Sequence, residues 1–200
     1  MIAIIKYNAG NITSVENALL RLGYSCIITD DASEIISAEK VIFPGVGEAS
    51  TAMSYLKNRG LDTVIKSLTQ PVLGICLGLQ LMCNYSEEGD TQCLGIFNTS
   101  VKKFPPKDIV PHMGWNNLYN TKGELFNNFE LTDTVYFVHS YYSQICEDTI
   151  AECNYILPFS AAIQHNNFYA TQFHPEKSAS VGETILKNFL HIEKPDLITK

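Results

Sequence analysis

The amino-acid sequence predicts an α/β fold, in which helices flank a central, mostly parallel sheet that carries an antiparallel extension in its second half. In the first half of the chain, apolar runs of strand length alternate with stretches of helical periodicity, which is typical of parallel sheets with crossover helices. In the second half, short strand-like segments are separated by turn signals. The 200 residues are 46% hydrophobic and 18% charged, a globular composition, and we expect a single domain over residues 1–200.

The elements of the first half follow from periodicity and from start and stop signals. Thr13 and Glu16 form a capping-box pattern, hydrophobic residues follow at helical spacing, and Gly23 ends that helix. We expect strands at residues 2–7, 24–29, 41–43 and 71–75, and helices at residues 13–22, 48–58, 62–68 and 77–85.

The second half predicts further strands and one closing helix. Turn signals include the Pro-Pro pair at 105–106 and the Asn-Asn pair at 166–167, and the latter predicts a hairpin. We expect strands at residues 135–141, 160–164 and 168–173, and an amphipathic helix at residues 181–192.

Charge and cysteine usage restrict the class of function. Fourteen basic side chains against 21 acidic ones give a net charge of −7, which argues against nucleic acid as a partner. The most apolar stretch, residues 71–83, is too short to span a membrane, and the N-terminus resembles a strand more than a signal peptide. The six cysteines lack close pairs, so we expect a cytoplasmic protein with free thiols, no metal site and no cofactor.

The most informative stretch is Gly-Ile-Cys-Leu-Gly at residues 74–78. A predicted strand leads directly into Cys76 and a predicted helix follows, with glycines two residues away on either side, which is the nucleophile-elbow pattern. The helix N-terminus favours the thiolate of Cys76, and the N–H of Leu77 points to where an oxyanion would form. Alternatively, Cys76 is a small core residue after a buried strand, as we expect for the other cysteines.

A cysteine nucleophile needs a general base and a group that orients this base. His174 follows a predicted strand, and because residues two apart in an extended segment face the same way, Glu176 can accept a hydrogen bond from its ring. The alternative is a histidine at a strand end beside a solvated glutamate. We expect His165 and His191 on the surface, whereas His112 and His139 stay undecided.

Together, residues 74–80 and the His-Pro-Glu run at 174–176 resemble the class I, triad-type glutamine amidotransferases over essentially the whole chain. Within that class, the runs at 111–116, 136–141 and 172–178 resemble the glutaminase subunits of imidazole glycerol phosphate synthases. The resemblance implies a flavodoxin-like fold and hydrolysis of L-glutamine to glutamate and ammonia.

The resemblance also implies the role of each site residue. Cys76 would be the nucleophile, His174 the base and Glu176 the group that orients it. The backbone of Leu77, Gly45 and Val46 would hold the oxyanion, and Gln80, Glu88, Ser140 and Tyr141 would bind glutamine.

By the same resemblance, the ammonia passes to a cyclase subunit with a (β/α)₈ barrel in a heterodimer. The cyclase converts PRFAR, a phosphoribosyl-formimino intermediate, to imidazole glycerol phosphate and AICAR in histidine biosynthesis. The docking face would include Asn8, Trp115, Tyr136 and Lys177.

One segment departs from the family pattern, because Lys6 and Asn8 replace the residues that usually stand beside Tyr7. Three alternatives therefore stay open. The chain could supply ammonia to a different synthase, such as one that amidinates surface sugars. It could be a non-catalytic amidotransferase-like subunit, or a cysteine protease or thiol hydrolase on the same scaffold.

Overall fold

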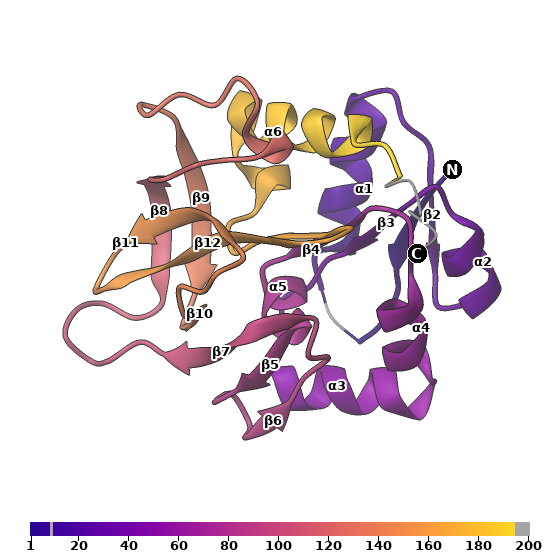
Figure 1. Ribbon diagram of the computed structural model, residues 1–200, viewed down its shortest axis with the longest axis horizontal. Helices are drawn as coiled ribbons and strands as arrows, with labels where there is room; N and C mark the ends of the chain where they lie inside the picture. Colours follow the sequence, from indigo (N-terminus) through magenta and orange to yellow (C-terminus); the bar gives the residue numbers. More distant parts are fainter. Residues whose placement is uncertain (9, 195–200) are drawn as a thin grey trace.

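A central sheet of seven strands organises the chain in the computed structural model, which describes residues 1–8 and 10–194. Its strands are β1 (Ile2–Ile5), β2 (Cys26–Thr29), β3 (Lys40–Phe43), β4 (Val72–Ile75), β11 (Thr149–Asn154), β12 (Pro158–His165) and β13 (Phe168–Thr171). The strands follow the order β11-β12-β13-β4-β3-β1-β2 across the sheet. Figure 1 labels β11, β12, β4, β3 and β2 of this sheet.

The pairing within this sheet confirms the predicted fold class. Strands β13, β4, β3, β1 and β2 pair in parallel, and between β1 and β4 helices return the chain to the same end of the sheet. Strands β11, β12 and β13 pair antiparallel, and the Asn-Asn turn at 166–167 joins the last two as predicted. The second half therefore extends the sheet of the first.

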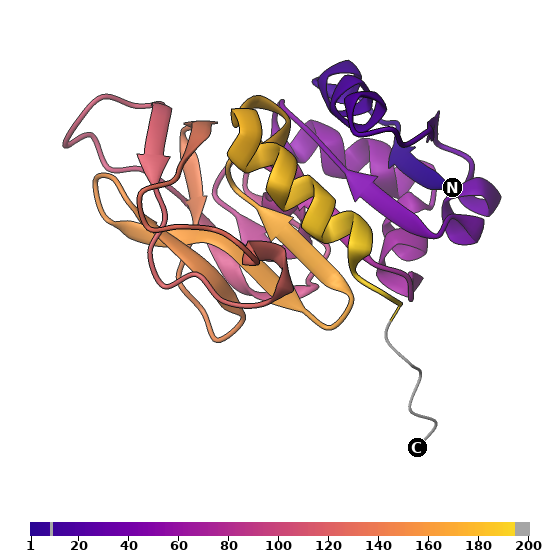
Figure 2. The ribbon, with the colours of Figure 1, turned by 90° about the horizontal axis from the view of Figure 1, so that it is seen from above.

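Helices cover both faces of the sheet, and each face has its own hydrophobic core (Figures 1 and 2). Apolar side chains of α1 (Ile12–Arg21) and α6 (Ala179–His191) fill one core. Those of α2 (Ala32–Ser37), α3 (Ala49–Asn58) and α4 (Leu61–Ser67) fill the other. The sheet is therefore buried on both sides, which explains its nearly continuous apolar strands.

Two smaller sheets lie beside the central one, where the sequence predicts a single extension. The first, in the order β10-β7-β5-β6, contains β5 (Cys83–Ser86), β6 (Thr91–Gln92), β7 (Phe97–Lys103) and β10 (Tyr141–Ser143). The second is the antiparallel pair of β8 (His112–Asn117) and β9 (Thr134–His139). Two short 3-10 helices complete the described chain, η1 (Glu124–Phe126) and η2 (Pro175–Lys177).

Two predicted elements need correction, and one helix was not predicted. The helix expected at 77–85 is α5 (Leu77–Met82), since Cys83 turns extended and the following residues pair with β7 and β6. The capping box at Thr13 is wrong, because the helix already begins at Ile12 after Asn11 in a left-handed conformation. Helix α2 was not predicted, since its six residues are too short for a periodic signal.

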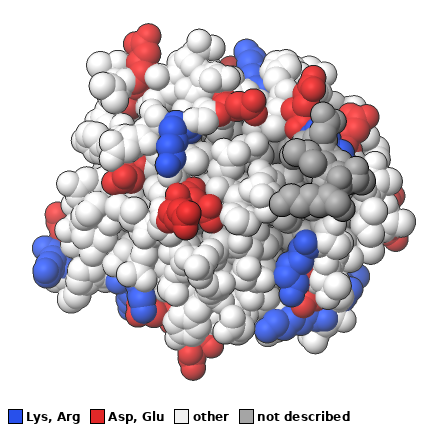
Figure 3. All heavy atoms as spheres, in the orientation of Figure 1, with Lys and Arg blue, Asp and Glu red and all other residues white. Residues whose placement is uncertain are grey.

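The surface of Figure 3 carries acidic and basic side chains interspersed. Within the described residues, no helix is long and apolar enough to cross a membrane. The expected single domain over residues 1–200 stays a prediction, and residues 9 and 195–200 lie outside the described residues. Ala9 belongs to the departing segment at 6–11.

Candidate active site

Cys76 occupies a sharp turn between strand β4 and helix α5. Its backbone angles, φ 53° and ψ −104°, lie in a region that side chains rarely adopt, and its N–H donates to the Thr171 carbonyl at 2.7 Å. A Cβ atom at Gly78 would lie 1.9 Å from the carbonyl oxygen of Phe43. The turn therefore requires glycine two residues after the cysteine, as the elbow pattern predicts.

The turn places Cys76 beside a pocket of about 270 Å³, and the residue itself is 6% exposed. The pocket brings together residues from β4–α5, the loop after β3 and the segment that joins β9 to β10. It is lined by Val46, Gly47, Cys76, Leu77, Gln80, Glu88, Pro111, Val138, His139, Ser140 and Tyr141. All four residues predicted to bind glutamine are among them.

His174 and Glu176 form a buried pair close to Cys76. The ring Nδ1 lies 2.7 Å from a carboxylate oxygen of Glu176, and both side chains are fully buried. Burial alone would lower the pKa of His174, but the charge of Cys76, and after it Glu176, raise the pKa to about 10. The ring Nε2 is buried and makes no hydrogen bond within the described part of the chain. It can therefore take a proton from the thiol.

Asn11 is a further contact of this pair that the sequence does not reveal. Its side-chain amide donates to the same Glu176 carboxylate and lies 3.4 Å from Nδ1 of His174. Asn11 has φ 72°, a left-handed conformation that asparagine tolerates better than most residues. The only feature of the sequence that could have pointed to Asn11 is the Gly-Asn pair after the first strand.

The backbone groups predicted to hold an oxyanion are not all free. The N–H of Leu77 donates to the carbonyl of Gly45 at 3.2 Å, and the carbonyl of Val46 accepts from the N–H of Gly10 at 3.1 Å. A Cβ atom on Gly45 would fall 1.9 Å from the hydroxyl of Tyr7, so this loop packs tightly against the residue that follows the first strand by two positions. An oxyanion site at Leu77 requires the Gly45 carbonyl to move away.

Two of the predicted glutamine-binding side chains are partly engaged. The amide nitrogen of Gln80 donates to the Tyr141 carbonyl at 2.9 Å. Glu88 accepts from the N–H of Ala49 at 2.9 Å, and burial raises the pKa of its carboxyl. Oε1 of Gln80 and the second carboxylate oxygen of Glu88 remain for a polar ligand, whereas the Ser140 carbonyl already accepts from the N–H of Phe104 at 3.0 Å.

The two undecided histidines form a buried pair. Nδ1 of His112 lies 3.0 Å from Nε2 of His139, and Nδ1 of His139 lies 2.8 Å from the Tyr141 carbonyl. Burial lowers the pKa of His112 to about 4 and that of His139 to about 3. Both rings are therefore neutral near neutral pH. His165 and His191 are exposed, as predicted.

The residues predicted to face a partner are at least partly accessible. Trp115 is 54% exposed and its ring lies 6.0 Å from that of Tyr136 across the β8–β9 pair. Asn8 and Lys177 are exposed. The carbonyl of Tyr136 also accepts from the N–H of His174 at 2.9 Å, which connects this surface directly to the buried pair.

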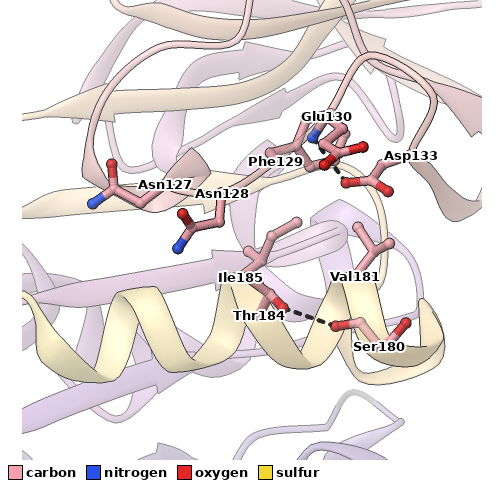
Figure 4. Close-up of a pocket in the computed structure, with 9 residues that line it drawn as sticks. All are labelled: Asn127, Asn128, Phe129, Glu130, Asp133, Ser180, Val181, Thr184 and Ile185. Carbon is pink, nitrogen blue, oxygen red and sulfur yellow. Dashed lines mark hydrogen bonds between the residues drawn. The ribbon is translucent and has the colours of Figure 1, made fainter.

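A second pocket, of about 300 Å³, lies between the segment at 127–133 and α6 (Figure 4). The N–H of Glu130 donates to the carboxylate of Asp133 at 2.9 Å, and the hydroxyl of Thr184 donates to the Ser180 carbonyl at 3.1 Å. None of the five residues predicted to act as nucleophile, base or orienting group or to hold glutamine through a side chain lines this pocket.

Comparison with known proteins places the chain in a family. Residues 3–192 match the family described as glutamine amidotransferase class-I. A curated Bacteroides fragilis protein named imidazole glycerol phosphate synthase subunit HisH is 59% identical over 194 residues, covering 96% of this chain and 99% of that protein. A Legionella pneumophila protein named subunit HisH 2 of the same synthase is 48% identical over 196 residues, covering 96% and 98%.

Solved structures share the fold at low identity. The structure of PurLQS from Thermotoga maritima matches with a TM-score of 0.69 and 13% identity, covering 94% of this chain and 96% of that one. The glutaminase domain of Trypanosoma brucei CTPS with bound acivicin has a TM-score of 0.63 and 16% identity, covering 94% and 93%. At these identities the likeness concerns the fold alone.

Proposed function

The chain belongs to the class-I glutamine amidotransferases, and from that premise we propose that it is the glutaminase subunit of an imidazole glycerol phosphate synthase. It hydrolyses L-glutamine to glutamate and ammonia for histidine biosynthesis. The observation that carries the proposal is Cys76, which lies on a strained turn beside a pocket and raises the pKa of a histidine held by a carboxylate.

We assign the chemical steps to this group of residues. The thiol proton of Cys76 passes to Nε2 of His174 before the attack, and the sulfur then adds to the side-chain amide carbon of glutamine. His174 then gives this proton to the departing ammonia, which leaves a thioester on Cys76. A water molecule, deprotonated by His174, attacks the thioester, and glutamate leaves as the thiol forms again. Glu176 holds the ring in the tautomer that these transfers need.

The oxyanion of each step is the charge that the protein must stabilise. We propose that the N–H groups of Leu77 and Val46 bind it once the Gly45 carbonyl has left Leu77. Because that carbonyl occupies the Leu77 N–H at 3.2 Å, the isolated chain should be a weak glutaminase. Its activity should rise steeply when the partner and the partner's ligand are added.

We propose that Gln80, Glu88, Ser140 and Tyr141 bind glutamine, since all of them line the pocket beside Cys76.

The partner is a cyclase subunit with a (β/α)₈ barrel, which forms a heterodimer with this chain and uses the ammonia to make imidazole glycerol phosphate and AICAR from PRFAR. Exposed Trp115 and its neighbour Tyr136 support a docking face there, and we add Asn8 and Lys177 to it. The six free thiols are consistent with a reaction in the cytoplasm.

Replacement of the nucleophile tests the proposal. In the complex with the cyclase, Cys76→Ala should abolish glutamine-dependent formation of imidazole glycerol phosphate and leave ammonia-dependent formation intact. Cys26→Ala, a cysteine on β2, is the matched control and should keep both activities. Glutamine hydrolysis by the Cys76→Ala protein would overturn the assignment.

A second candidate is a glutaminase that serves another synthase. Lys6 and Asn8 favour it, because both depart from the family pattern in the segment that contains Gly10, which contacts the oxyanion loop. Reconstitution with the cyclase from the same organism decides between the two. Strong stimulation of glutamine hydrolysis supports the histidine pathway, whereas no stimulation supports the alternative.

A further inference from the structure

Gln172 is a fully buried amide that contacts the sulfur of Cys76. It follows strand β13 and precedes His174 by two residues, and its backbone N–H donates to the Ala161 carbonyl at 2.8 Å. Its side-chain nitrogen, Nε2, lies 3.7 Å from Sγ of Cys76, within hydrogen-bond distance for sulfur. Neither the elbow nor the His-Glu pair accounts for a buried amide at this place.

The orientation of this amide is set by its neighbours. The Tyr141 carbonyl can only accept, so the atom of Gln80 that lies 2.9 Å from it must be the donating Nε2. The same Nε2 donates to Oε1 of Gln172 at 3.0 Å. The oxygen of Gln172 thus faces Gln80, and its N–H group must face the sulfur.

The histidine pair extends this arrangement. Since the Tyr141 carbonyl also accepts from Nδ1 of His139, Nε2 of this neutral ring must accept a hydrogen bond from the N–H at Nδ1 of His112. Nε2 of His112 then accepts from the amide of Asn116 at 3.3 Å.

The last group in this series of hydrogen bonds, the amide of Asn116, is also fixed. The amide orientation of Asn116 is set by the N–H of Asn117, which donates to its oxygen at 2.9 Å. Two hydrogen-bonded series therefore meet at the Tyr141 carbonyl, which accepts from His139 on the side of strand β8 and from Gln80 on the side of the sulfur.

We propose that Gln172 is a further residue of the active site, which donates a hydrogen bond to the sulfur of Cys76 and stabilises its thiolate. The proposal rests on the proposed function in one respect, that Cys76 is the nucleophile. When the thiol proton moves to His174, the sulfur becomes an anion, and a donor binds an anion more strongly than a neutral thiol. Gln80 and the carbonyl of Tyr141 are positioning groups that keep the donor aimed at the sulfur.

Two substitutions remove the donor in different ways. Gln172→Glu keeps the length of the side chain and the oxygen that faces Gln80, but places a second oxygen against the sulfur. Gln172→Met keeps the length of the side chain and offers no donor. If the buried carboxylate prevents Gln172→Glu from folding, Gln172→Met still tests whether the donor stabilises the thiolate. The matched control is Gln164→Glu on β12, where the amide donates to the Tyr169 hydroxyl at 3.2 Å, away from the pocket.

The measurement is alkylation of Cys76 by iodoacetamide in the full chain, followed on the Cys76 peptide by mass spectrometry from about pH 5 to 10. Both Gln172 variants should shift the midpoint of the rate profile to higher pH and react about tenfold more slowly at neutral pH. The control should keep the wild-type profile. In the complex, the kcat for glutamine should fall by a similar factor, with KM little changed.

A wild-type alkylation profile in a folded Gln172 variant would overturn the proposal, even if the variant melts at a lower temperature. Such a variant would show that the amide only fills space. This outcome differs from failure of the proposed function, since alkylation needs neither glutamine nor the partner, and the function is tested by Cys76→Ala.

Discussion

His174 and His139 are both buried, yet their environments drive them in opposite directions. His174 is 0% exposed and its pKa is raised to about 10, whereas His139 is 6% exposed and its pKa is lowered to about 3. Burial disfavours the charged form of both rings. His174 faces Cys76 and the carboxylate of Glu176, while His139 faces a neutral ring and a carbonyl.

The contrast teaches that burial does not make a histidine a catalytic base. An anionic neighbour on each side stabilises the imidazolium of His174, which a proton-transfer group needs. The pair of His112 and His139 instead satisfies every ring nitrogen in the neutral state. This pair holds the backbone of Tyr141, which lines the pocket.

The largest expected effect comes from removing the carboxylate beside His174. Glu176→Gln should lower glutamine-dependent turnover of the complex on the order of 10³-fold, because the amide cannot stabilise the charged ring. Ammonia-dependent turnover should stay unchanged. The control is Glu152→Gln, whose carboxylate accepts a hydrogen bond from Asn120 at the surface. A loss below threefold, roughly 0.6 kcal/mol, would mean that His174 works without this partner.

A second prediction concerns the dependence of stability on pH. His112 and His139 titrate near 6.5 when unfolded but at about 4 and about 3 when folded, so the unfolded state binds more protons between these values. The free energy of unfolding should therefore fall as the pH is lowered below about 6.5, by about 2 kcal/mol between pH 6.5 and 5.5. Urea unfolding at both pH values measures this change in the free energy of unfolding.

His112→Phe sharpens this test, since the ring of His112 stacks on Phe137 and Tyr155 at 4.7 and 4.2 Å. The variant should lose about half of the pH-dependent change, as one of the two rings is gone. Equal pH dependence in His112→Phe and the wild type would contradict a neutral buried pair.

The smallest effect is expected at Asn11. Asn11→Ala removes one donor from the Glu176 carboxylate and should lower kcat about tenfold, with little change in KM. Asn120→Ala is the matched control, since Asn120 is also left-handed, with φ 53°, and donates to Glu152 at 2.9 Å on the surface. Equal activity of the two variants would assign Asn11 a purely local role.

The sequence predicts those parts of the site that lie within a few residues of one another. The glycines around Cys76 express local backbone geometry, and the structure has this feature. The contact of His174 with Glu176 is also present, but the extended segment predicted for it is wrong, because Glu176 lies in the 3-10 helix η2 that starts at Pro175. Alternating strands and helices likewise predict the sheet and the covering of its two faces.

The parts that the sequence does not predict are contacts between distant segments. Asn11 meets Glu176 across 165 positions and Gln172 meets Cys76 across 96, and nothing in the local pattern marks either pair. The bond between Leu77 and Gly45 is made by backbone groups that every residue carries, so no residue type signals it. Helix α5 ends early because distant strands pair with its continuation.

The protonation of His174 tests the central contrast most directly. ¹⁵N NMR of the histidine rings at about pH 8 should show both nitrogens of His174 protonated, while His112 and His139 are neutral and carry their proton on Nδ1. In Cys76→Ala the His174 ring should titrate at lower pH. A neutral His174 ring in the wild-type protein at that pH, or a charged His139, would contradict the account.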